Sequence, residues 1–146
     1  MDNEEIKERI KRGAIRAKII VEIVGSPEEY VKNIIDVKSK EIAEHFEVIH
    51  TELGEPKKIS EKFHSAFMEI EMLFPDISTL MGFIFDYMPS SIEIIEPEEI
   101  TEDTHNFSDI LNDLAVRLHQ HSEVIIRLKA MNALLNKKVK KVEKKD

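Results

Sequence analysis

The sequence predicts an α+β domain followed by one long amphipathic helix. Three observations lead to this prediction: short segments alternate apolar and polar residues, the segments between them have helical spacing, and a heptad repeat runs through the last forty residues. With 146 residues, of which 42% are hydrophobic and 34% charged, the chain can bury the core of one domain. We therefore expect a short N-terminal helix at 1–13, a folded α+β domain at 14–100, and a coiled-coil helix with a basic tail at 101–146.

The folded domain begins with a strand and a helix. From Ile15 to Ile23 every second residue is apolar, which is typical of a half-buried strand. A helix is then expected as far as about residue 46, with Ser26 as its N-cap, Pro27 in its first turn and Glu29 completing a capping box. This segment places Lys38 in an otherwise apolar helical stripe.

The remainder of the domain adds three strands and a second helix. Strands are expected at about residues 48–53, 61–73 and 92–95, and a short helix begins after Asp76, the expected N-cap. The element order is then βαββαβ. Because crossovers between parallel strands are right-handed, the simplest arrangement is a ferredoxin-like sandwich, with two helices on one sheet face and the other face open.

The C-terminal segment contains the strongest pattern in the chain. Steps of four and three residues from Phe107 reach eleven positions, nine of them apolar, over about five heptads. We interpret these positions as the seam of a parallel coiled-coil dimer. The predicted seam residues are Phe107, Leu111, Leu114, Leu118, His121, Ile125, Leu128, Asn132, Leu135 and Val139.

Two polar residues interrupt this seam. Asn132 occupies an a position, where a single asparagine specifies the register of parallel dimers, so we expect it to pair with its own copy. The alternative is a surface asparagine on a helix that packs within its own chain. His121 occupies a d position, where two protonated copies would repel each other near pH 6. The alternative is a seam histidine without a regulatory role.

The open sheet face is expected to carry Ile20, Phe63 and Phe67, and three interpretations follow. The segment 66–70 resembles part of the third-strand motif of RNA-recognition-motif domains, but Ser65 replaces a stacking aromatic. An ACT-like regulatory domain would bind a small ligand between paired sheets, but no glycine-rich loop follows the first strand. We favour a face that is covered by the C-terminal helix or by a second subunit.

Charge is distributed unevenly along the chain. Residues 127–146 contain eight Lys or Arg residues against two acidic residues, a net charge of +6, so the net charge of −8 leaves −14 for residues 1–126. The basic tail either contacts a phosphate backbone or complements the helix dipole and keeps the helix end soluble, and the second interpretation is favoured. Its lysines are Lys137, Lys138, Lys140, Lys141, Lys144 and Lys145.

The sequence shows no set of residues typical of catalysis or cofactor binding. Cysteine is absent, and no HExxH, Walker A, GxGxxG, GxSxG or EF-hand pattern occurs, so we predict no enzyme activity, no cofactor and no metal site. The chain has no apolar run long enough for a membrane span and no signal peptide, which predicts a cytoplasmic protein without membrane contact. The composition, free of Cys and Trp, weakly favours a thermophilic source.

These observations predict a non-enzymatic homodimeric assembly or adaptor protein that dimerises through its C-terminal helix. A higher oligomer and an additional protein partner remain open at this point. The alternative is a regulatory protein that senses a small ligand in an ACT-like manner, or that associates with nucleic acid through the basic tail.

Overall fold

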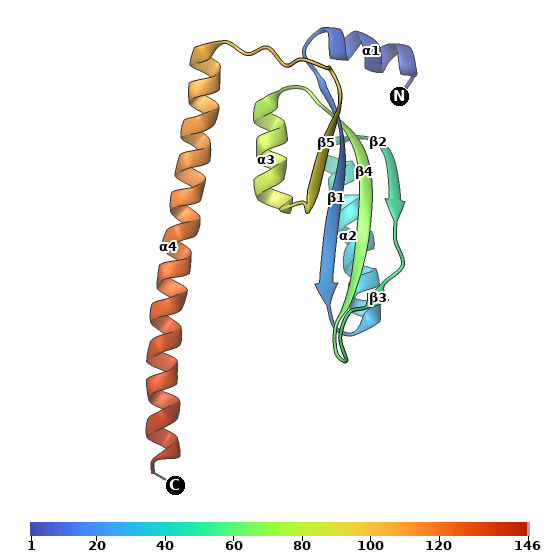
Figure 1. Cartoon of the computed structure of the whole chain (residues 1–146). Coiled ribbons are helices and arrows are strands. Elements are labelled where there is room, and N and C mark those ends of the chain that lie inside the picture. Colours follow the sequence, from blue (N-terminus) through green and yellow to red (C-terminus); the bar gives the residue numbers. More distant parts are fainter. Residues whose placement is uncertain (146) are drawn as a thin grey trace. The chain divides into compact units, whose positions relative to one another are not determined.

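The computed structural model describes residues 1–145 and divides into two compact units, 1–101 and 102–146. The first unit is the α+β domain, and the second contains one long helix (Figure 1). The elements, in chain order, are α1 (Asn3–Lys11), β1 (Ile15–Gly25), α2 (Glu28–His45), β2 (Glu47–Leu53), β3 (Lys57–Lys58), β4 (His64–Phe74), α3 (Ile77–Tyr87), β5 (Ser91–Glu96) and α4 (Thr104–Glu143). The predicted α+β class and the long C-terminal helix are confirmed.

The sheet is antiparallel, with strand order β2-β4-β1-β5 and with β3 paired to the start of β4. Its two central strands, β1 and β4, pair over their full length, from Ile15 opposite Phe74 to Gly25 opposite His64. The pairing of β1 with β5 shifts between Arg16 and Ala17, so the edge strand β5 is irregular near its end. These two central strands therefore supply side chains to both faces of the sheet.

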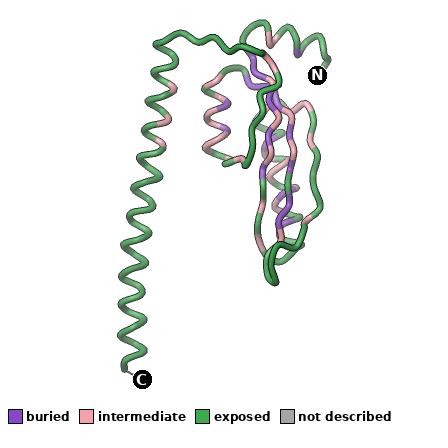
Figure 2. The backbone as a smooth tube through the Cα atoms, in the orientation of Figure 1, coloured by how far each residue is buried: buried purple, intermediate pink, exposed green. Residues whose placement is uncertain are grey.

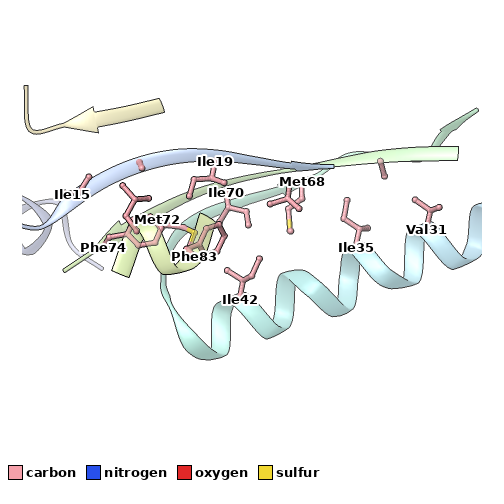
Figure 3. Packing of buried hydrophobic residues seen from close by; sticks show 14 residues of the cluster. Ile15, Ile19, Val31, Ile35, Ile42, Met68, Ile70, Met72, Phe74 and Phe83 are labelled. Atoms are coloured by element: carbon pink, nitrogen blue, oxygen red, sulfur yellow. The ribbon is translucent and has the colours of Figure 1, made fainter. Parts of the chain in front are cut away.

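The core lies between one face of this sheet and the helices α2 and α3 (Figure 3). Alternate residues of β1 are buried, as the apolar alternation in the sequence predicts, and the same holds for β4. Helix α2 adds three buried aliphatic residues and α3 adds two buried residues. The core residues from these four elements are Ile15, Ala17, Ile19, Val21, Val31, Ile35, Ile42, Ala66, Met68, Ile70, Met72, Phe74, Leu80 and Phe83.

Aromatic rings join α2 to α3 at one end of the core. The ring of Phe83 stacks on Tyr87 with centroids 4.7 Å apart, and Phe46 meets Phe83 edge-on at 5.2 Å. This packing explains the lysine in the apolar stripe of α2. The Lys38 Nζ lies 5.5 Å from the Tyr87 ring centroid and 2.8 Å from Glu41, so its charge is satisfied at the rim of the core.

The second sheet face is partly covered, which differs from the open face that the sequence predicts. Helix α1 packs Ile6 and Ile10 against Leu73 and Ile49, and Leu73 is only 2% exposed although it lies on the face opposite the core. An ion pair between Arg9 and Glu47 also links α1 to β2. The apolar residues of α1 therefore close one corner of the second face.

Two local predictions were wrong. The strand expected at 61–73 begins at His64, because the backbone N–H groups of Ile59 and Ser60 donate to the Phe63 carbonyl and close a turn. The apolar alternation simply continues into this turn. The capping box at Ser26 is not formed, since α2 begins at Glu28 with Pro27 in the cap position and no side-chain cap. Asp76, by contrast, caps α3 as predicted, with its carboxylate 2.7 Å from the Thr79 nitrogen.

Candidate interaction surfaces

The predicted seam lies entirely on α4, and α4 has no buried residue (Figure 2). Leu114 is half-buried, and the other nine predicted seam residues are exposed. The exposure is large even for the leucines; Leu128, for example, is 59% exposed. The apolar stripe of α4 is therefore not covered by other residues of its own unit.

The helix itself is well defined at both ends. It begins after Asp103, whose carboxylate accepts a hydrogen bond of 2.9 Å from the Asn106 N–H. Thr104 is the first helical residue, so the cap position belongs to Asp103. Lys140 and Lys141 lie in the last turn, where positive charge complements the helix dipole.

The stripe is wider than a simple two-helix seam. Ile110, Val124 and Met131 occupy the g positions of the heptad and extend the apolar surface to one side. In the second half of the helix, the residues around Asn132 also line a shallow depression in the α4 surface. Its apolar lining is Ile125, Leu128, Met131 and Leu135.

Ion pairs occupy one half of the second sheet face. Arg16 on β1 contacts Glu71 on β4 and lies 3.2 Å from Glu96 on β5, so one guanidinium joins three strands. The hydrogen bond with Glu71 is the main cause that raises the pKa of Arg16. Lys18 lies 3.2 Å from Glu69, and this contact raises the pKa of Lys18. These pairs were not predicted from the sequence, although the alternate spacing of the charged residues on the two strands was the available signal.

The apolar part of the second face is small. Phe67 on β4 is 48% exposed and lies opposite Glu22 on β1, and Ile20 is half-buried. Phe63 is 49% exposed but precedes the strand, within the turn before β4. Only one of the two phenylalanines therefore projects from the sheet itself, and no paired aromatic platform for stacking bases is formed by these residues.

The basic tail is exposed along its whole length. All six of its lysines are exposed, and within residues 1–145 none of them forms an ion pair with a carboxylate. Several lysines of the first unit differ, since Lys18, Lys32, Lys38 and Lys40 each lie within 4 Å of a carboxylate. The tail is thus a concentrated positive surface.

No set of residues in the described part of the chain has the geometry of a metal or membrane site. Across residues 1–145, no three His, Asp or Glu side chains come together in a way that could hold a metal ion. In the same residues, no helix has both the length and the apolar character needed to cross a membrane. A shallow pocket between α2 and the end of β2 is lined by Lys32, Asn33, Asp36, Leu53 and Gly54, among others, and contains no nucleophile paired with a base.

Together, these features define a small α+β protein in which one unit has its own core and the other is a long helix with an exposed apolar stripe. The chain belongs to the MJ0538 family, whose model matches residues 1–127. The match covers the whole first unit and the first part of α4, whereas residues 128–146, with the basic lysines, lie outside it. Neither the curated proteins nor the solved structures contain a match to this chain.

Proposed function

We propose that this protein is a non-enzymatic assembly protein that joins two copies of itself through a parallel coiled coil of α4. The observation that supports this proposal most strongly is a helix of 40 residues that has no buried residue, although its apolar side chains follow a heptad repeat. Helices in water gain most of their stability from packing an apolar face. Each seam leucine that becomes buried would contribute about 1.5–3 kcal/mol.

A second copy of the same helix fits this stripe better than an unrelated surface does. In a parallel pair, Asn132 meets its own copy at an a position, where the two side-chain amides can hydrogen-bond to each other. Lys138 at a g position lies next to Glu143 at the following e position of the partner helix, which is the arrangement of interhelical ion pairs in parallel coiled coils. The Asn132 pair and the Lys138–Glu143 pair both require the two helices to be parallel.

The first unit would then be the part that each copy contributes to the assembly. We propose a ferredoxin-like topology for it, supported by the strand order β2-β4-β1-β5 and by the position of α2 and α3 on one sheet face. The ion pairs around Arg16 and Lys18 give the second face a polar and acidic character. That character favours protein contacts over the ACT-like ligand site considered as an alternative.

The mass of the chain in solution tests the proposal. We expect a dimer for the native chain by sedimentation equilibrium, and a monomer for Leu128→Asp, with Kd weakened at least about 100-fold because both copies lose a buried leucine. Val116→Asp is a matched control. Val116 is 55% exposed on the same helix but lies at an f position, so this variant should remain a dimer. A monomeric native chain would overturn the proposal.

Cysteine cross-linking tests the orientation of the two helices. The chain has no native cysteine, so every disulfide that forms must involve an introduced residue. In a parallel pair, Leu118→Cys chains should form disulfides with one another. In an antiparallel pair with Ile125 opposite Leu128, Leu118 would instead face Leu135 of the partner, and the basic tail would lie near the acidic start of the other helix. A mixture of Leu118→Cys and Leu135→Cys chains that forms only the mixed disulfide would therefore refute the parallel orientation.

A further inference from the structure

The lysines of the basic tail avoid the proposed seam. Lys137, Lys138, Lys140 and Lys141 occupy the f, g, b and c positions of α4, and Val139 and Val142 hold the a and d positions between and after them, whereas Lys144 and Lys145 follow the end of the helix at Glu143. Formation of the coiled coil therefore leaves the lysine side chains at its outer surface. The dimer would present these charges rather than bury them.

The positive charge of this segment is only partly compensated nearby. Residues 137–146 contain six lysines and two acidic residues, Glu143 and Asp146, which leaves a net charge of +4. Asp109 and Asp113, near the start of the same helix, lie about 36 Å or more away along its axis at 1.5 Å per residue. Screening limits such interactions to about 8 Å at physiological salt, so these carboxylates do not neutralise the lysines.

Parallel pairing brings two such segments side by side. Coiled-coil helix axes lie about 8–10 Å apart, so about twelve lysines would share a length of about 12 Å along the axis. The two tails repel each other unless an anion of matching charge density lies between or along them. A nucleic-acid duplex has this property, with about one negative charge per 1.7 Å of its axis.

We infer that the paired tails of the dimer form a binding site for the phosphate backbone of a nucleic-acid duplex, a site that a single chain supplies only in half. The inference rests on the proposed parallel homodimer. Lysine is a point charge without the bidentate geometry that reads a guanine edge, so the contact is independent of base sequence. Residues 129–146 contain no aromatic residue, so the tail has no ring on which unpaired bases could stack, and a duplex is preferred over a single strand.

Binding and dimerisation are then coupled. A duplex that contacts both tails binds the dimer more tightly than it binds the monomer, and by thermodynamic linkage it strengthens the dimer by the same factor. The affinity also falls steeply with salt, with a slope of about −0.9 in log K against log salt for each phosphate neutralised.

Fluorescence anisotropy with a labelled duplex DNA of mixed sequence, about 20 base pairs long, tests the site on the full chain at two salt concentrations. We expect the triple variant Lys140→Gln, Lys141→Gln, Lys144→Gln to bind at least about tenfold more weakly and with a shallower salt slope, because each lysine removed neutralises one phosphate fewer. Its control is Lys57→Gln, Lys58→Gln, Lys62→Gln, which removes the same charge from exposed lysines of the first unit. Equal losses in the two variants, or no binding by the native chain, would overturn the inference.

A second set of variants distinguishes failure of the nucleic-acid site from failure of the proposed dimer. Leu128→Asp should bind the duplex more weakly and with a shallower salt slope, while Val116→Asp should match the native chain. If the native chain sediments as a dimer but does not bind the duplex, the inference fails and the dimer stands. If Leu128→Asp binds as tightly as the native chain does, the site does not need a partner copy, and the inference fails. Tighter binding of poly-glutamate than of the duplex at equal charge would also refute it, since an acidic protein would then be the partner.

Discussion

The two units of this protein differ in whether their apolar residues are buried. In residues 1–101, the alternating residues of β1 and β4 lie under α2 and α3, and the core contains fourteen buried residues from those four elements. In α4, residues of the same types recur with equal regularity and none is buried. The periodicity of an apolar pattern thus predicts which element forms, but it does not show whether the burial is completed within one chain.

The comparison also separates two sources of stability. The first unit completes its packing alone, so its unfolding should not depend on protein concentration. If α4 pairs with a second copy as proposed, its helical content and thermal transition should depend on concentration. Substitutions that alter one unit at a time show whether the other unit responds.

The largest effect is expected from Phe83→Ala. Phe83 is fully buried and contacts the rings of Phe46, Phe74 and Tyr87, so the cavity left by its removal should lower the free energy of unfolding of the first unit by about 3–5 kcal/mol. Urea unfolding measures this loss, and sedimentation should still report the native mass. A change in mass would show that the two units are not independent.

A smaller effect of opposite sign is expected from Asn132→Leu. Replacing a polar seam residue by leucine should tighten association by about 1–2 kcal/mol and should also permit oligomers other than the dimer. Sedimentation equilibrium over a range of concentrations reports both effects. Weaker association would place Asn132 outside the seam, whereas the stability of the first unit should be unchanged in either case.

The two N-caps allow a matched comparison. Asp76 caps α3 and Asp103 caps α4, each through a bond to the backbone nitrogen three residues later. Asp76→Ala should lower the free energy of unfolding of the first unit by about 1 kcal/mol, and Asp103→Ala should reduce only the helical content of the second unit. Circular dichroism during urea unfolding distinguishes the two effects. If both variants weakened the same transition, the division into two units would be contradicted.

The smallest effect concerns pH. A hydrogen bond from Lys38, with a second from the Tyr87 hydroxyl, holds the pKa of Glu41 below its ordinary value of 4.5. A lowered carboxyl pKa adds stability above the ordinary value, and this contribution is lost as the pH falls through the folded-state pKa. The melting temperature of the native chain should therefore exceed that of Glu41→Gln at neutral pH, and the gap should shrink below pH 4.5. A gap that does not vary with pH would contradict this role.

The sequence was most informative where a regular pattern coincided with packing inside one chain. The α+β class, the alternation in β1 and the Asp76 cap could all be predicted from residue spacing. Prediction was weakest at element ends: the same alternation passes from β4 into the turn that contains Phe63, and only the hydrogen bonds to the Phe63 carbonyl mark the boundary. The spacing of apolar residues along one strand does not show where a hydrogen-bonded turn precedes that strand.

The surfaces were predicted less completely than the core. The sequence predicted the long helix that carries the proposed seam residues, because a helix has a constant period. It did not show that α1 covers Leu73 or that Arg16 joins three strands, because both depend on which strands are neighbours. Contacts between distant segments follow from topology, and one sequence contains no direct signal for them.

The irregular edge strand β5 has a consequence for growth of the sheet. β5 is short, its register against β1 shifts near Arg16, and Glu93 and Glu96 lie on it. Short length, irregular register and charge are the features that keep an exposed edge from recruiting foreign strands. Fibril formation by edge-to-edge addition is therefore disfavoured at this border of the sheet.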